Sequence, residues 1–179
     1  LYASYGVATS PSARAKLARI VRKAPEVVVK VTGRQRGDKH VKAHLDYIGR
    51  KGGVGIETRD GEILTSKDDI AERAAEWSDT LQWRSRPTVS SVSLVFSMPA
   101  GTDPDKVLGA VRALAHAELS DNHDYVLALH TDTPRPHVHL TVQAEGLDRT
   151  RFNPRPVQLN RFRERFAREL RARGVAAEA

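Results

Sequence analysis

Residues 124–144 read DYVLALHTDTPRPHVHLTVQA, two apolar stretches joined by a short segment that contains two prolines. Apolar residues alternate along both stretches, which is typical of β-strands, so we predict strands over 124–130 and 137–144. Proline has no backbone N–H to donate to a strand ladder, so the residues between the two stretches are expected to form the connection. The segment therefore predicts two adjacent antiparallel strands.

These strands place three of the chain's seven histidines close together. Side chains alternate between faces along a strand, so His137 and His139 point to one face and the apolar residues beside them point to the other. If 131–136 is the connection, His130 pairs across from His137 and the small Ala128 pairs across from His139. Since cross-strand Cβ atoms lie about 4.5–5.5 Å apart, the three imidazoles can converge.

Three converging histidines with open coordination positions are typical of a catalytic metal site. The chain has no cysteine, so any metal has to bind His, Asp or Glu. The alternative is a set of ordinary surface histidines on a half-exposed sheet, and for three in this register we favour the metal. His40 and His44 also have a ligand spacing on a predicted helix, but they lack a third ligand nearby, so we interpret them as a solvated helix face. His116 and His123 are interpreted as surface and turn residues.

Further strands and helices are expected on both sides of this segment. We predict strands at 26–32 and 89–96, a hairpin within 54–64, and helices at 38–50, 66–81, 103–119 and 157–173. Adjacent strands mixed with helices favour an α+β fold with a central antiparallel sheet flanked by helices. We expect residues 1–24 to form a basic arm or partial element, and 25–179 to form the folded domain.

The charge of the chain suits a polyanionic partner. Lys plus Arg number 29 against 22 Asp plus Glu, which gives a net charge of +7 and an isoelectric point near 10.0. No apolar run approaches the roughly 18–20 residues of a membrane span, and no signal peptide is evident, so we expect a cytoplasmic protein without a membrane span. The basic residues that we expect to contact nucleic acid are Arg34, Arg36, Arg50, Lys51, Arg149, Arg151 and Arg155.

Tyrosine is a demanding nucleophile because its phenol, with a pKa of about 10, is mostly neutral near pH 7. A metal that acts as a Lewis acid on a phosphate lowers the need for a strong base. Of the four tyrosines, Tyr2 and Tyr5 lie in the predicted arm, and Tyr125 falls on the apolar side of the sheet. Tyr47 is left, near the end of a predicted helix and followed by basic residues and glycines, although a partly buried helix aromatic is an alternative for this segment alone.

The segment PHVHL, with His130 seven residues before His137, resembles the signature of the HUH endonuclease superfamily, two histidines that flank one hydrophobic residue. More narrowly, the chain resembles the conjugative and mobilisation relaxases of the MobA/VirD type. Four blocks within about 26–174 carry the resemblance: VVVKVTGRQRG, HLDYIGRKGGVGIETRDGE, YVLALHTDTPRPHVHLTVQAEG and RFNPRPVQLNRFRERFARELRARGV.

The resemblance implies an HUH-like fold and a chemistry. In that family a tyrosine attacks a single-stranded DNA phosphate at an origin of transfer, becomes joined to the 5′ end and leaves a free 3′ hydroxyl, and the reaction reverses. Carried over by position, Tyr47 is the nucleophile, and His130, His137 and His139 hold Mg²⁺ or Mn²⁺.

The proton acceptor is open among three residues, and we place Asp132 ahead of His44 and Asp46. The resemblance also implies accessory relaxosome proteins and a secretion coupling protein as partners. It implies a bacterial host in which the protein can travel with the DNA, and family members commonly continue into further domains. Two alternatives remain: a rolling-circle replication initiator, and a nucleic-acid-binding module whose histidine site is structural or degenerate.

Overall fold

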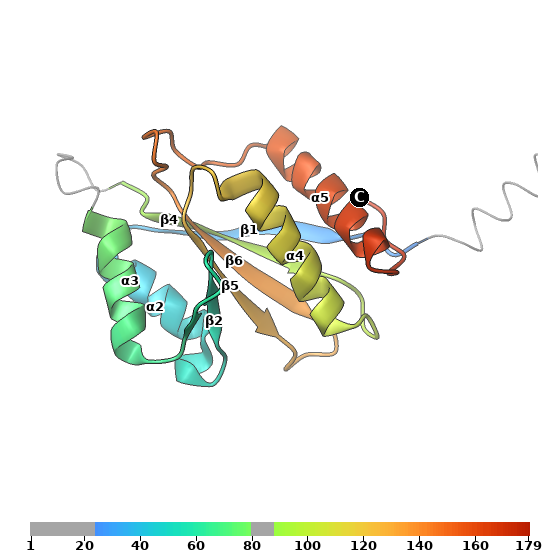
Figure 1. Ribbon diagram of the computed structural model, residues 1–179, viewed down its shortest axis with the longest axis horizontal. Coiled ribbons are helices and arrows are strands. Elements are labelled where there is room, and N and C mark those ends of the chain that lie inside the picture. Colours follow the sequence, from blue (N-terminus) through green and yellow to red (C-terminus); the bar gives the residue numbers. More distant parts are fainter. Residues whose placement is uncertain (1–23, 80–87) are drawn as a thin grey trace, which may run out of the picture.

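The computed structural model describes residues 24–79 and 88–179. The predicted arm lies outside the described residues except for Ala24, as does the end of the helix predicted over 66–81. Six strands form one antiparallel sheet in the order β1-β4-β6-β5-β2-β3 (Figure 1). The strands are β1 (Val28–Gln35), β2 (Ile56–Thr58), β3 (Ile63–Leu64), β4 (Ser91–Ser97), β5 (Tyr125–His130) and β6 (His137–Gln143).

Helices flank both faces of this sheet, which confirms the predicted α+β architecture. They are α2 (Gly37–Ile48), α3 (Lys67–Asp79), α4 (Pro104–Leu119) and α5 (Pro156–Ala172), with a short 3₁₀ helix, η1 (Arg50–Gly52), directly after α2. Two helix starts follow from their capping residues, since Asp103 accepts a hydrogen bond from the Asp105 amide at α4 and Ser66 accepts one from the Asp69 amide at α3. Among the described residues, no helix combines the length and the apolar character that crossing a membrane requires.

One face of the sheet is closed by α4 and α5 (Figure 1). Alternate residues of β4 and β6, including Leu94, Phe96 and Leu140, point into a core with the apolar side of these helices. Phe96 and Phe166 meet edge to face with ring centroids 5.3 Å apart. The alternation of apolar residues along these strands predicts that this face of the sheet is apolar.

The opposite face is closed over only part of its width. The apolar residues of α2 and α3, such as Leu45 and Trp77, form a second core with β2, β3 and β5. Further along the sheet, β4 presents serines and one valine to this side, because SVSLVFS alternates small hydroxyls with core residues. Lys30, which pairs with Val95, is exposed there. This half of the face is polar, and it is open over β1, where Lys30 and Thr32 are exposed, whereas Ser91 and Ser93 of β4 are buried.

Strand β1 differs from the prediction. The sequence predicts that it ends at Gly33, but the strand continues to Gln35 with a shift in pairing register between Val31 and Gly33. Glycine tolerates the irregular backbone of a bulge, so the strand continues through Gly33 instead of ending there. Arg34 therefore lies on this strand, beyond the end predicted at residue 32.

Candidate metal centre and nucleophile

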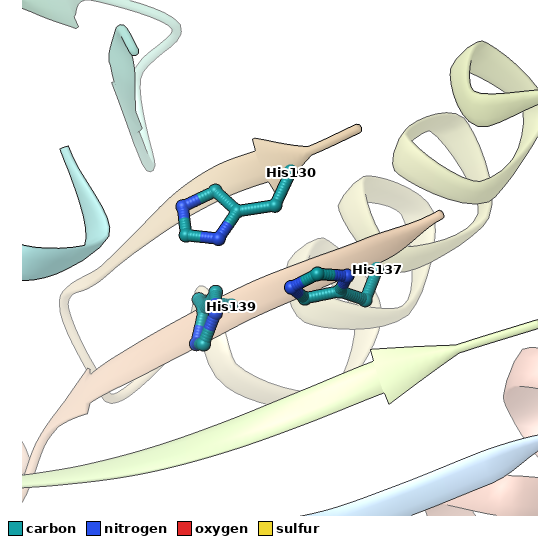
Figure 2. Close-up of side chains that lie close together, drawn as sticks. All are labelled: His130, His137 and His139. Atoms are coloured by element: carbon teal, nitrogen blue, oxygen red, sulfur yellow. The ribbon is translucent and has the colours of Figure 1, made fainter. Parts of the chain in front are cut away.

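The three histidines converge as the strand register predicts. His130 pairs with His137, and Ala128 pairs with His139, across the β5–β6 ladder. One ring nitrogen from each histidine lies within 4.8 Å of the other two, and the three rings surround a shared space (Figure 2). His130 and His139 are buried and His137 is half-buried, so the cluster sits at the rim of the second core and not on a plain half-exposed sheet.

Both nitrogens of His130 have polar neighbours. Nε2 lies 2.6 Å from the Ile48 carbonyl oxygen at the end of α2. Nδ1 lies 3.1 Å from Nη2 of Arg50, the residue two positions further on. The end of α2 and the turn after it are thus bound directly to the histidine cluster.

Two of the three clustered histidines are held in the uncharged form that binds metals. Burial, reinforced by the neighbouring His130 and His137, lowers the pKa of His139 to about 3. Burial also lowers the pKa of His130 below its usual value. Nδ1 of His139 is buried and has no hydrogen-bond partner among residues 24–79 and 88–179. Three converging imidazoles, two of them held neutral by burial and one with an unsatisfied nitrogen, fit a divalent metal ion.

His44 is not on a solvated helix face, so that interpretation was wrong. Its Nε2 lies 2.9 Å from Oγ1 of Thr141 on β6, and burial lowers its pKa to about 4. His123, interpreted as a turn residue, is also buried, and its Nδ1 lies 3.0 Å from the Gln143 carbonyl oxygen. The flank of α2 that carries His44 therefore rests on the strand that carries two of the three clustered histidines.

Tyr47 lies one helical turn beyond His44, at the end of α2. It is 59% exposed, and its ring centroid is 6.3 Å from that of His139 with the planes at 85°. The Arg50 guanidinium carbon lies 5.3 Å from the Tyr47 ring centroid. Tyr125 is buried in the first core, as predicted, and burial raises its pKa. Of the two tyrosines described, only Tyr47 presents its side chain beside the histidines.

The three acid–base candidates lie in different surroundings. Asp132, in the β5–β6 connection, has Oδ2 at 2.8 Å from Arg50 Nη2. Asp46 pairs with Lys42 at 2.7 Å, on the flank of α2 away from Tyr47. The side chain of Asp132 is about half exposed, and its link to Arg50 brings it to the rim of the cluster.

The predicted DNA-contacting residues fall into two groups. Arg50 and Lys51 lie in η1 beside the cluster. Arg34, Arg36 and Arg151 line a hollow of about 360 Å³ together with Phe152 and Asn153; Arg149 and Arg155 lie in the exposed segment after β6. The hollow is at the other end of the strands, roughly 10–17 Å from the cluster for the three to five residues of strand rise between the histidines of β6 and Val142. It opens on the α4–α5 side of the sheet, because Arg34 pairs with Val92 of the first core.

Two features of the site were not predicted. Thr141 and the β4 serines carry no motif, and their place beside the site depends on which sheet half the helices cover. The contact from Arg50 to His130 joins residues 80 positions apart. The signals available in the sequence were the alternation of serine with apolar residues in β4 and the glycines that flank Arg50.

Comparisons with known proteins identify a family and a similar fold. A family model described as the nuclease domain of MobA/VirD2-like relaxases matches residues 47–175, well over half of the chain. A search of curated proteins finds no match. A similar solved structure, described as "Molecular Basis of Vancomycin Resistance Transfer in Staphylococcus aureus", has 12% sequence identity and a TM-score of 0.54, covering 86% of this chain and 98% of that chain. At this identity the likeness shows a shared fold.

Proposed function

The chain belongs to the MobA/VirD2-like relaxase nuclease family, and from this premise we propose that it nicks and rejoins single-stranded DNA at an origin of transfer through Tyr47. The observation that carries the proposal is the exposed phenol of Tyr47 beside three converging histidines. Nuclease chemistry follows from the family. The choice of nucleophile, ligands and DNA contacts is ours.

The reaction begins with the Tyr47 phenol oxygen attacking the scissile phosphorus. A P–O bond forms to tyrosine, the bond from phosphorus to the 3′ oxygen breaks, and the 5′ end stays on the protein as a phosphotyrosyl ester. The phenol proton passes to a base, for which we propose Asp132, and the departing 3′ oxygen takes up a proton to become a hydroxyl. In the reverse direction that hydroxyl attacks the ester and rejoins the strand.

His130, His137 and His139 would hold the divalent ion that the family chemistry calls for. When bound, such an ion supplies Lewis-acid stabilisation of the charge that develops on the phosphate. Of the two ions predicted, Mn²⁺ suits this donor set better, because imidazole nitrogens favour transition metals whereas Mg²⁺ prefers oxygen ligands. The uncharged state of the buried histidines supports binding without prior loss of protons near pH 7.

A path for the DNA runs along α2. The helix begins near the arginine hollow, where the Gly37 amide donates to Ser90 Oγ at 3.0 Å, and ends at Tyr47 and Ile48 beside the cluster. Its length of about 18 Å is enough to span from the cluster to this end of the sheet. We propose that the backbone of a single strand follows this flank from Arg50 and Lys51 at the nick. It then passes round the end of the sheet to Arg34, Arg36, Arg149, Arg151 and Arg155.

The biological setting is also part of the proposal. Family membership supports a bacterial cytoplasmic relaxase that acts in conjugative transfer and can travel with the DNA. Accessory relaxosome proteins and a secretion coupling protein would be its protein partners. We further propose that residues 25–179 fold as the nicking domain and that residues 1–24 form an appended arm.

The decisive experiment tests Tyr47 as the nucleophile. The chain is incubated with candidate single-stranded origin oligonucleotides and Mn²⁺, and mass spectrometry locates any DNA adduct. We expect an adduct on Tyr47 and none in the Tyr47→Phe variant, which keeps the ring and removes only the hydroxyl. Tyr125→Phe is the matched control because that tyrosine is buried, and it should still form the adduct. An adduct on another tyrosine, or efficient nicking by Tyr47→Phe, would contradict the assignment.

A further inference from the structure

The hydrogen bonds of His130 specify which of its nitrogens carries a lone pair. A carbonyl oxygen only accepts hydrogen bonds, so Nε2, at 2.6 Å from the Ile48 oxygen, carries the proton. Nδ1 is then the acceptor, and Arg50 Nη2 donates to it at 3.1 Å. The same Nη2 lies 2.8 Å from Asp132 Oδ2, and its two hydrogens serve both acceptors.

A metal ion and the Arg50 guanidinium therefore need the same lone pair. A neutral imidazole has a single nitrogen lone pair, and a metal ligand has to use it. Switching to the other nitrogen would break the short bond to Ile48 and leave the buried carbonyl oxygen without that donor. A divalent cation next to a guanidinium would also be repelled by it.

We propose that Arg50 is a resident cation that occupies the metal-facing nitrogen of His130 and leaves it when the metal and the DNA bind. The DNA phosphate is the partner that Arg50 takes in exchange, since guanidinium pairs strongly with phosphate oxygens. This inference rests on the proposed function, because it assigns Arg50 to the strand that Tyr47 attacks. Arg50 is a positioning residue under this proposal.

The backbone after α2 is shaped to hold Arg50 in this position. Arg50 and Lys51 have φ values of 49° and 54°, and Gly52 has 94°. Consecutive non-glycine residues in the left-handed region are costly and persist where the surrounding structure requires them. Here the turn returns the Arg50 side chain over Tyr47 and between His130 and Asp132. Because the Arg50 guanidinium contacts Tyr47, His130 and Asp132, its release requires another group, such as a phosphate, to take the place of these contacts.

Metal and DNA binding should consequently strengthen each other. When a DNA phosphate pairs with Arg50, Nδ1 of His130 becomes free for the metal. When a metal displaces Arg50, the guanidinium becomes available to the phosphate. Thermodynamic linkage requires the two effects to be equal in size. The exchange also releases Asp132 from its ion pair, which leaves its carboxylate able to accept the Tyr47 proton.

The test measures the affinity of the whole chain for Mn²⁺, from the electron paramagnetic resonance signal of the free ion, without DNA. Arg50→Gln removes the guanidinium and should bind Mn²⁺ about tenfold more tightly than the unchanged chain, the loss of one competing charged hydrogen bond. Lys51→Gln is the matched control, because it removes the neighbouring positive charge without a contact to His130. It should change Mn²⁺ affinity by no more than about twofold.

A second measurement repeats the titrations with a short oligothymidylate in the Tyr47→Phe background, so that no strand is cut. After correction for Mn²⁺ bound by the DNA alone, oligothymidylate should raise Mn²⁺ affinity in the chain that keeps Arg50. In the Arg50→Gln chain it should do so much less. Thermal unfolding of both variants without metal establishes that each is folded.

The outcomes separate this inference from the proposed function. If Arg50→Gln binds Mn²⁺ no more tightly than the unchanged chain, or no better than Lys51→Gln, Arg50 is not a competitor and the inference is wrong, even when the Tyr47 adduct forms. If neither chain binds Mn²⁺ saturably, the inference is also wrong. If no adduct forms on Tyr47 in the unchanged chain, the proposed function fails whatever the Mn²⁺ titrations give.

Discussion

The two faces of the sheet are built from the same strands but are closed in different ways. On the α4–α5 face, alternate residues of β1, β4, β5 and β6 enter one apolar core. On the α2–α3 face, a smaller core covers β2, β3 and β5, and the histidine cluster lies at its edge beside the polar half over β1 and β4. The comparison teaches that apolar burial is extensive on one face and incomplete on the other, where the histidines and Tyr47 lie.

The largest effect should come from the cluster on the open face. His137→Ala removes a half-buried imidazole, so the metal-free fold should keep its unfolding midpoint while nicking falls by a factor on the order of 10³ or more. Nicking rates and thermal unfolding with and without Mn²⁺ measure the two effects, and the stabilisation by Mn²⁺ should disappear. His116→Ala, at an exposed position of α4, is the control. A folded His137→Ala chain with normal nicking would contradict the metal site.

A substitution on the closed face should do the opposite. Phe96 is fully buried and meets Phe166 edge to face, so Phe96→Ala should lower the free energy of unfolding by about 3–5 kcal/mol. Ser97→Ala changes the next residue of the same strand, which points to the open face, and should alter stability by about 0.5 kcal/mol or less. Urea unfolding of both variants tests the contrast. Equal losses would show that the two faces do not differ as described.

Acid should weaken the attachment of α2 to the open face. The pKa of His44 is about 4 in the folded chain, below the value of about 6.5 expected when unfolded. Above pH 6.5 the imidazole is neutral in both states. As pH falls from 6.5 towards 4, the unfolded chain binds the proton first, so stability is lost, by at most about 3 kcal/mol.

His44→Gln, which cannot titrate, isolates this contribution. Its free energy of unfolding should fall less steeply between pH 6.5 and 4.5 than that of the unchanged chain, with a chelator present in both series. The substitution also removes the repulsion by which a charged His44 lowers the pKa of His139, so the difference between slopes belongs to His44 together with this coupling. Parallel curves would mean that burial does not hold His44 neutral in the folded chain.

The smallest effect should be seen at the far end of the proposed DNA path. Arg34→Gln should reduce the affinity for oligothymidylate a few-fold and lower the slope of log affinity against log salt by about 0.7, the value for one phosphate contact on a single strand. Arg112→Gln is the matched control, because that arginine lies on α4 and pairs with Glu57 at 2.6 Å. If the slope of log affinity against log salt is unchanged in Arg34→Gln, the DNA does not contact the hollow.

Much of this fold follows from local patterns that a sequence displays directly. Alternation in YVLALH and HVHLTVQ predicts both strands, their apolar face and the pairing of His130 with His137, because covalent geometry makes successive strand side chains point to opposite sides. The starts of α3 and α4 likewise follow from their capping residues, Ser66 and Asp103. The strand β1 was placed less well, since a bulge at Gly33 depends on the partner strand and not on the glycine alone.

The remaining parts of the site depend on contacts between distant residues. His44 meets Thr141 across 97 positions, and Arg50 meets His130 across 80. The sequence predicts that α2 is amphipathic, but its apolar stripe would fit any part of an apolar sheet face. Where the helix packs follows from the complementary surfaces of β2, β3 and β5, and that packing leaves His44 half-buried against Thr141 and not on a solvated helix face. The same packing brings Tyr47 and Arg50 to the histidines. The sequence alone does not show this, because the two surfaces that pack together exist only in the folded chain.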